Sequence, residues 1–117
     1  MTMEADLSTL LKTVCQRTFP DVAPSGTAAP FIAWQALGGE SLRYLDNTAP
    51  DKRNTYMQVS VYSKTRAEAL ALIRAAESAM CASPAIIVKP QGEPISSYED
   101  GTQLYGSIQR FSIWAAR

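Results

Sequence analysis

Residues 55–81 read TYMQVSVYSKTRAEALALIRAAESAMC and carry the clearest structural signal in the chain. Met57, Val59 and Val61 alternate with polar or amphipathic residues, a period of two that is typical of a half-buried strand. The segment TRAE at 65–68 fits a capping box, in which the Thr hydroxyl and the Glu carboxylate satisfy free amide groups at a helix start. Apolar residues then recur every three or four positions as far as residue 80. We therefore expect a strand that runs directly into a helix over 65–81.

The region before this stretch predicts one more helix and one more strand. Leucines and a valine at 7, 10, 11 and 14 form one helical face, and prolines from residue 20 stop the pattern, which predicts a helix over 3–18. Residues 30–37 are short, aromatic and bounded by Pro30 and Gly38, as expected for a strand. Both faces of that strand are largely apolar, so both should be covered, and one cover can be another subunit. Residues 39–54 predict a long exposed loop or hairpin tip.

The region after the helix predicts a strand hairpin. Residues 85–88 suit a short strand, and residues 95–98 and 104–115 flank Asp100 and Gly101, a dipeptide that supplies positive φ for a tight turn. The alternation slips near Gln109, which allows a bulge there. The order α-β-β-α-β-β predicts an α+β two-layer sandwich, with a mainly antiparallel sheet of about four strands and two helices on one face. We expect residues 1–117 to form a single domain.

Composition excludes several classes of protein. The 117 residues are 46% apolar, and eleven basic residues balance eleven acidic ones. A chain with zero net charge has no broad basic field for nucleic acid or anionic lipid, so we expect neither as a partner. Its apolar stretches are far shorter than the roughly 20 residues that cross a bilayer. The first residues lack the basic start of a signal peptide, which favours the cytoplasm, and we expect Cys15 and Cys81 to be buried, reduced thiols.

The chemical inventory argues against catalysis. The chain has no His, which removes Ser-His-Asp and Cys-His nucleophiles and His-based zinc sites, and it has no glycine-rich phosphate loop. Tyr62, Lys64 and Glu68 are a candidate acid-base group, but helix capping explains Glu68 better. We predict no catalytic residue, no metal site and no cofactor.

The predicted loop at 39–54 is best interpreted as a contact for another protein. Its basic residues and tyrosine could hold a phosphate, but acidic residues in the same loop cancel their charge, so a protein partner is the better interpretation. The candidate interface residues are Arg43, Tyr44, Asp46, Asp51, Lys52 and Arg53. Tyrosines and tryptophans elsewhere suit protein interfaces as well as a core.

Three stretches together resemble a known family. They are residues 29–35 (APFIAWQ), residues 56–69 (YMQVSVYSKTRAEA) and the aromatic end formed by Tyr98, Leu104-Tyr105 and residues 109–114 (QRFSIW). In this order they resemble the small tail-completion, or tail-terminator-like, proteins of long-tailed phages and prophages. The resemblance spans nearly the whole chain.

The resemblance implies a structural role in virion assembly. Such proteins form a ring, a hexamer in tail terminators, that caps the tail tube and faces the head connector. The implied partners are a second copy of the chain, the tube protein and the connector protein. The implied location is the bacterial cytoplasm during assembly and then the head-proximal end of the tail. The alternative is a small non-catalytic module that binds a ligand or protein in a groove between the second helix and the sheet, without a phage role.

Overall fold

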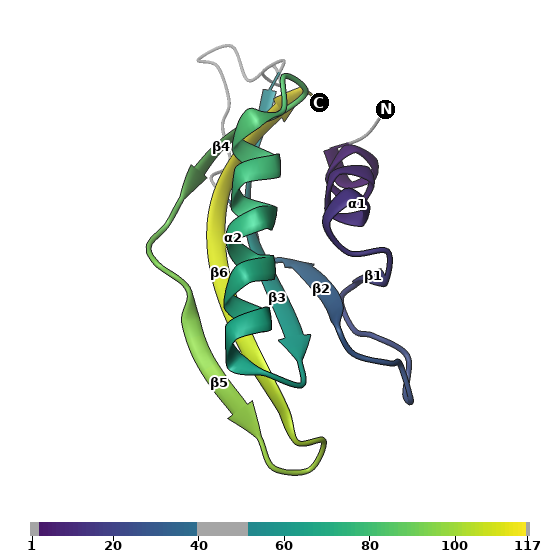
Figure 1. Cartoon of the computed structure of the whole chain (residues 1–117). Helices are drawn as coiled ribbons and strands as arrows, with labels where there is room; N and C mark the ends of the chain where they lie inside the picture. The colour runs from purple at the N-terminus through teal and green to yellow at the C-terminus, as the bar shows by residue number, and fades with distance from the viewer. Residues whose placement is uncertain (1–2, 40–51, 117) are drawn as a thin grey trace.

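The computed structural model describes residues 3–39 and 52–116, which form one sheet with two helices packed on it (Figure 1). In chain order the elements are α1 (Met3–Val14), β1 (Thr18–Pro20), β2 (Phe31–Ala36), β3 (Lys52–Ser63), α2 (Arg66–Ala82), β4 (Ile87–Pro90), β5 (Ile95–Glu99) and β6 (Leu104–Ala116). The strands lie in the order β1-β2-β3-β6-β4, and β5 also pairs with β6. Only β1 and β2, among the described pairs, run parallel.

The two longest strands form the centre of the sheet. β3 and β6 are antiparallel and stay in one register from Lys52 opposite Ala116 to Ser63 opposite Tyr105. Alternate residues of a strand point to opposite faces, so this register places Met57 beside Phe111 on one face and Tyr62 beside Gly106 on the other. The sheet therefore has two chemically different faces.

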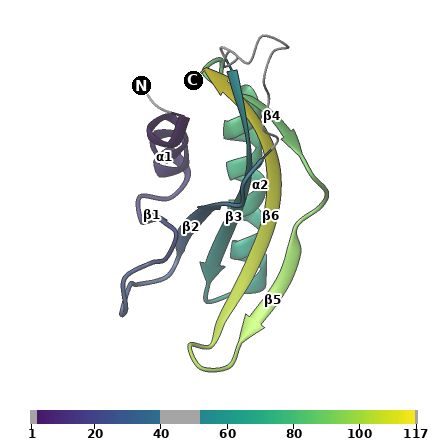
Figure 2. The same cartoon turned by 180° about the vertical axis from the view of Figure 1, so that it is seen from behind.

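The helices cover the first of these faces. Figure 2, seen from behind, shows α2 behind β3 and β6, and α1 packs beside α2. The buried apolar residues of the helices and strands form a single cluster. Its fully buried members are Leu7, Leu11, Ile32, Met57, Val59, Val61, Ile73, Ala76, Met80, Phe111 and Ile113. No described helix lies over the opposite face, which we call the uncovered face.

The start of α2 follows the predicted cap with one difference. The Thr65 hydroxyl accepts a hydrogen bond from the Glu68 amide at 3.2 Å, as expected for an N-cap. The Glu68 carboxylate accepts the hydroxyl proton of Ser63, and that hydroxyl oxygen lies 3.4 Å from the Thr65 amide. Ser63 thus links the two halves of the capping box and joins the end of β3 to the start of α2.

The predicted number of strands was wrong, although the α+β class holds. The described chain has six strands in the sheet rather than about four. β1 was missed because three residues are too few to show an alternating pattern. It is a strand because it pairs with β2. β4 and β5 are short pieces of one edge along β6, and β4 begins two residues later than predicted. Short edge strands are defined by the long strand beside them.

The first helix is shorter than predicted, and the bulge lies elsewhere. α1 ends at Val14 because the Thr18 hydroxyl binds the Cys15 carbonyl at 2.7 Å and the chain then enters β1. The pairing of β3 with β6 passes Gln109 without a break. The extra residues lie instead in the segment 91–94 between β4 and β5, where Pro90 pairs with Phe111 but Ile95 pairs with Ile108. The Gln109 amide donates to the Gly92 carbonyl at 2.9 Å and anchors this break.

Candidate functional site on the uncovered face

The floor of the candidate site consists of three cross-strand pairs of β2 and β3. The pairs are Phe31 with Tyr62, Ala33 with Ser60 and Gln35 with Gln58. Paired residues point to the same side of a sheet, so the register alone brings two rings, a hydroxyl and two amides together. The Phe31 and Tyr62 rings lie with their centroids 5.2 Å apart at 32° to each other.

One wall of the site follows β1. Asp21 has a φ of 61°, a left-handed conformation that Asp tolerates better than most residues. Its amide donates to the Trp34 carbonyl at 2.7 Å, and this bond turns residues 21–23 along the edge of β2. Val22 is consequently 77% exposed at the rim.

The opposite wall is the turn between β5 and β6. Glu99 pairs with Leu104, and the Gln103 amide donates to the Glu99 carbonyl at 2.8 Å. The predicted hairpin is present, but its positive φ of 57° belongs to Gln103 and not to the Asp100-Gly101 dipeptide. The turn therefore has four residues and is wider than predicted, and Thr102 reaches the cavity.

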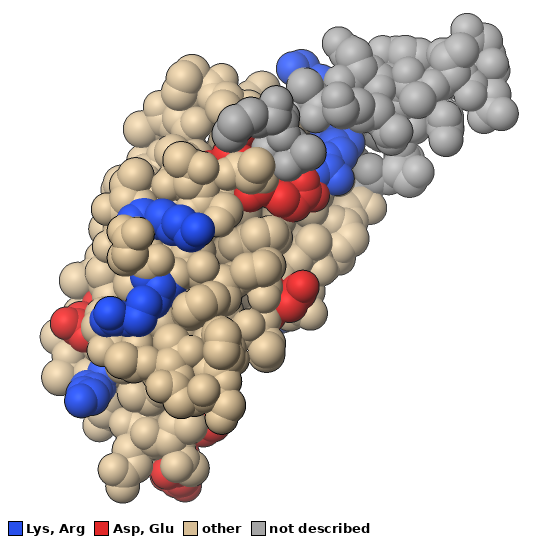
Figure 3. Space-filling view, turned by 90° about the vertical axis from the view of Figure 1, so that its right-hand side faces the viewer, with Lys and Arg blue, Asp and Glu red and all other residues tan. Residues whose placement is uncertain are grey.

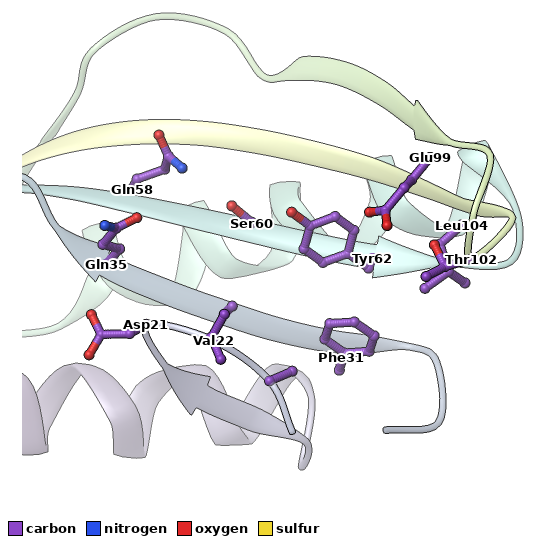
Figure 4. A pocket seen from close by; sticks show the side chains of 12 residues that line it. Asp21, Val22, Phe31, Gln35, Gln58, Ser60, Tyr62, Glu99, Thr102 and Leu104 are labelled. Carbon is purple, nitrogen blue, oxygen red and sulfur yellow. The ribbon is translucent and has the colours of Figure 1, made fainter. Parts of the chain in front are cut away.

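The walls and floor form an open cavity of about 370 Å³ (Figure 4). Its lining residues are Asp21, Val22, Ala23, Phe31, Ala33, Gln35, Gln58, Ser60, Tyr62, Glu99, Thr102 and Leu104. A second hollow of about 550 Å³ adjoins it and is lined by residues 23–29 and Lys64 among others. The two hollows share Ala23, Phe31, Thr102 and Leu104. A cavity of this size is comparable to sites that hold small molecules or single side chains.

Gly106 determines the position of the Tyr62 ring. A Cβ atom at residue 106 would lie 2.5 Å from the Ser97 hydroxyl and 3.2 Å from the Tyr62 ring. A larger residue at this strand position would displace the Ser97 hydroxyl and press on the edge of the Tyr62 ring from the neighbouring strand. An isolated glycine in a strand is the sequence signal that could have indicated this close approach.

The charges of the cavity are all negative. Asp21 and Glu99 are its ionisable lining residues apart from the tyrosine, and neither forms a salt bridge with any residue in 3–39 or 52–116. Arg110 lies just outside, where its Nε donates to the Gln58 side chain at 3.3 Å. On the side of the molecule shown in Figure 3, cationic and anionic side chains are interspersed, without a continuous patch of one sign among the described residues. The cavity is thus a local acidic feature.

The cavity is lined by groups that can bind a ligand by hydrogen bonding, charge and stacking. Its lining offers carboxylates, amides, hydroxyls and rings, but no thiol, amine or imidazole. The candidate group of Tyr62, Lys64 and Glu68 is not assembled, because Tyr62 lies on the uncovered face and the Glu68 carboxylate binds Ser63 at the helix cap. Within the described residues no three His, Cys, Asp or Glu side chains come close enough to hold a metal ion.

The predicted interface loop falls mainly outside the described residues. Arg43, Tyr44, Asp46 and Asp51 lie there, whereas Lys52 and Arg53 are the first residues of β3, which is longer than predicted. Lys52 is exposed. The Arg53 guanidinium donates to the Glu4 carboxylate of α1, and this hydrogen bond lowers the pKa of Glu4 below its ordinary value. Arg53 thus has a role inside the fold, and neither residue lines the cavity.

The two cysteines lie in different environments. Cys15 is buried and its thiol lies 3.4 Å from the Pro30 carbonyl, whereas Cys81 is exposed, so the prediction that both are buried was wrong for Cys81. Both thiols are free, as predicted. Partial burial, and to a lesser degree Glu77, raises the pKa of Cys81.

Comparison with known proteins assigns a family. The family model described as tail completion protein gp17 matches residues 2–116. No curated protein matches the chain. None of the helices in the described part is long and apolar enough to span a bilayer.

Proposed function

The chain belongs to the tail completion protein gp17 family, and from this membership we propose that it caps the phage tail tube and joins it to the head connector. The observation that carries the proposal is the family match, which covers nearly the whole chain. Membership gives the protein a role in phage tail assembly. The capping and joining steps, and a purely structural role without catalysis, are our proposal.

The uncovered face supports an assembly role. Ile87 and Ile95 are each 61% exposed, and their strand partners Trp114 and Ile108 place both on this face. Exposed apolar side chains on a sheet face without a helix are typical of surfaces that other chains cover. β2 and β6 each have strand partners on both sides, so their contribution to a subunit contact would come from their faces.

We propose that copies of the chain form a ring, a hexamer as the resemblance implies. Such a ring needs a heterologous contact, in which two different surfaces of the same chain meet at the angle that closes the ring. Arg43, Tyr44, Asp46, Asp51 and Lys52 are our candidates for contact with a neighbour or the tube. The working location is the bacterial cytoplasm during assembly and then the head-proximal end of the tail, with residues 1–117 acting as a single domain.

The loop candidates can be tested by charge reversal. Charge reversal of Arg53 would also break its ion pair with Glu4, so the informative double variant is Arg43→Glu with Lys52→Glu. Lys12→Glu, at an exposed cation in the last turn of α1, is the control. We expect the double variant to assemble poorly and the control to assemble normally. Normal assembly of the double variant would exclude the loop as a contact.

The proposed location can be tested on isolated tails. Tails from a lysate that lacks this gene are mixed with purified protein carrying an affinity tag, and gold particles that bind the tag are located by electron microscopy. The proposal expects one cluster of gold at the head-proximal end of each tail. Gold along the tube, at the distal tip or absent from tails would contradict it.

A further inference from the structure

We propose that the cavity on the uncovered face binds an arginine side chain presented by another protein of the tail. The inference rests on the proposed function only in its choice of a tail protein as the partner. The chemistry of the ligand follows from the residues that line the cavity.

The charge of the cavity favours a cationic ligand. Asp21 and Glu99 come from opposite walls, and Figure 4 shows the Glu99 carboxylate directed toward the Tyr62 ring. No described Lys or Arg forms a salt bridge with either residue or lines this cavity. The cation of Arg110 donates to the Gln58 side chain, at the end of the cavity away from Glu99 (Figure 4). Two carboxylates at the rim of one hollow raise the local affinity for a cation, and a hydrogen bond between two charged groups is stronger than a neutral one.

The aromatic floor of the cavity favours a planar cation. The Phe31 and Tyr62 rings form one end of the floor, and a guanidinium group stacks on aromatic rings while its edge donates to acceptors in the same plane. The Ser60 hydroxyl supplies a neutral acceptor next along the floor. The Gln35 and Gln58 side chains lie at its other end, where Gln58 already accepts a hydrogen bond from Arg110 (Figure 4). Arginine matches this combination of rings, carboxylate and hydroxyl better than the compact ammonium group of lysine.

The cavity is formed before any ligand binds. The strand register fixes the floor, the Asp21 turn fixes one wall and the bond from Gln103 to Glu99 fixes the other. Gly106 leaves the space in which the Tyr62 ring lies. A site with its groups already in place loses less conformational freedom on binding, so a single side chain can give measurable affinity.

The source of the arginine is best assigned to a different protein. Of the five arginines in the described part of the chain, four already bond to their own chain. These are Arg17 with the Pro30 carbonyl, Arg53 with Glu4, Arg74 with Glu93 and Arg110 with Gln58. A second copy would have to break such a bond to use one of these four, or would have to present Arg66, which is exposed at the start of α2. We therefore assign the arginine to another tail protein on the basis of the proposed function, and a second copy is the outcome that a self-association measurement would reveal.

The test uses a small arginine probe and a neutral analogue of the same shape. Acetyl-arginine methylamide is titrated into the full chain while amide signals are followed by nuclear magnetic resonance, and acetyl-citrulline methylamide is the control. We expect saturable shifts at Ser60, Tyr62 and Glu99 with the arginine probe, and binding of the citrulline probe roughly tenfold weaker or more. Equal binding of both probes, or shifts outside the cavity, would overturn the proposal.

Variants separate the cavity from general surface charge. Glu99→Gln should weaken the arginine probe roughly tenfold, while Asp100→Asn, which removes a neighbouring carboxylate that does not line the cavity, should leave its affinity unchanged. Equal effects of the two variants would contradict a specific site. Because both positions are exposed, both variants should fold, which their amide spectra will verify.

Light scattering tests whether the arginine comes from another tail protein or from a second copy of the chain. If Glu99→Gln abolished self-association of the chain in light scattering, the arginine would come from a second copy and our assignment of the partner would be wrong. If the arginine probe failed to bind while the protein still ended tails of normal length, the inference would fail and the tail-completion role would stand. If the arginine probe bound but deletion of the gene left the tails unchanged, the arginine site would stand and the tail-completion role would fail.

Discussion

Trp34 allows a sharp test of how the core is packed. The residue lies in the middle of β2, is 8% exposed, and its indole nitrogen has no hydrogen-bond partner among the described residues. Replacing a packed tryptophan with alanine costs about 3–5 kcal/mol. Replacing it with phenylalanine loses about 1–2 kcal/mol of apolar burial. It also removes a buried donor whose desolvation costs about 1–3 kcal/mol. The two effects of Trp34→Phe should therefore nearly cancel.

Thermal unfolding followed by circular dichroism measures the difference. A chain of 117 residues has an unfolding entropy of roughly 0.25 kcal/mol per kelvin. Trp34→Ala should then lower the melting temperature by about 12–20 °C, and Trp34→Phe by less than about 5 °C. Urea unfolding should show a lower midpoint at unchanged slope for the alanine variant. If Trp34→Phe were as destabilising as Trp34→Ala, the assignment of an unpaired indole nitrogen in a filled core would be refuted.

Three further predictions follow from single contacts. The lowered pKa of Glu4 means that its bond to Arg53 stabilises the fold above the ordinary value of 4.5 and that this stabilisation is lost as pH falls through the lowered pKa. Glu4→Gln should thus lower the free energy of unfolding by less than about 1 kcal/mol at pH 7, since both side chains are about one-third exposed. In strong acid the substitution should have no effect, and an undiminished effect there would contradict the ion pair. Because partial burial raises the pKa of Cys81, its thiol should react with iodoacetamide at pH 8 more slowly than free cysteine, as followed by mass spectrometry. A rate faster than that of free cysteine would contradict the raised pKa. Gly106→Ala should displace the Ser97 hydroxyl, shift the edge of the Tyr62 ring and cost about 1–3 kcal/mol. Unchanged resonances of both Ser97 and Tyr62 would show that neither side chain depends on the glycine.

The strand and helix at 55–81 could be predicted because their signals are local. The alternation of Met57, Val59 and Val61 and the cap at Thr65 depend on residues close in sequence, and the structure confirms both. The length of β3 could not be predicted, because Lys52 and Arg53 become strand residues through pairing with β6. β1 and the two edge strands depend on partners far along the chain in the same way.

The cavity could not be derived from the sequence. Its floor requires the register of β2 against β3, which brings residue 31 beside residue 62, and no local pattern gives that register. Its walls come from Asp21 and Gln103, two residues with positive φ that are not glycine. Only Gly106 carried a readable signal, as an isolated glycine inside a strand pattern. The groove that the sequence suggested, between α2 and the sheet, is instead occupied by buried residues such as Ile73 and Phe111.

The central claim is that this protein completes the tail. It is tested most directly by electron microscopy of lysates from a phage or prophage that lacks the gene, beside the same strain with the gene restored. The account predicts overlong tubes or tails without heads in the deletion, and tails of normal length joined to heads on complementation. Intact particles with an unchanged distribution of tail lengths in the deletion would contradict it.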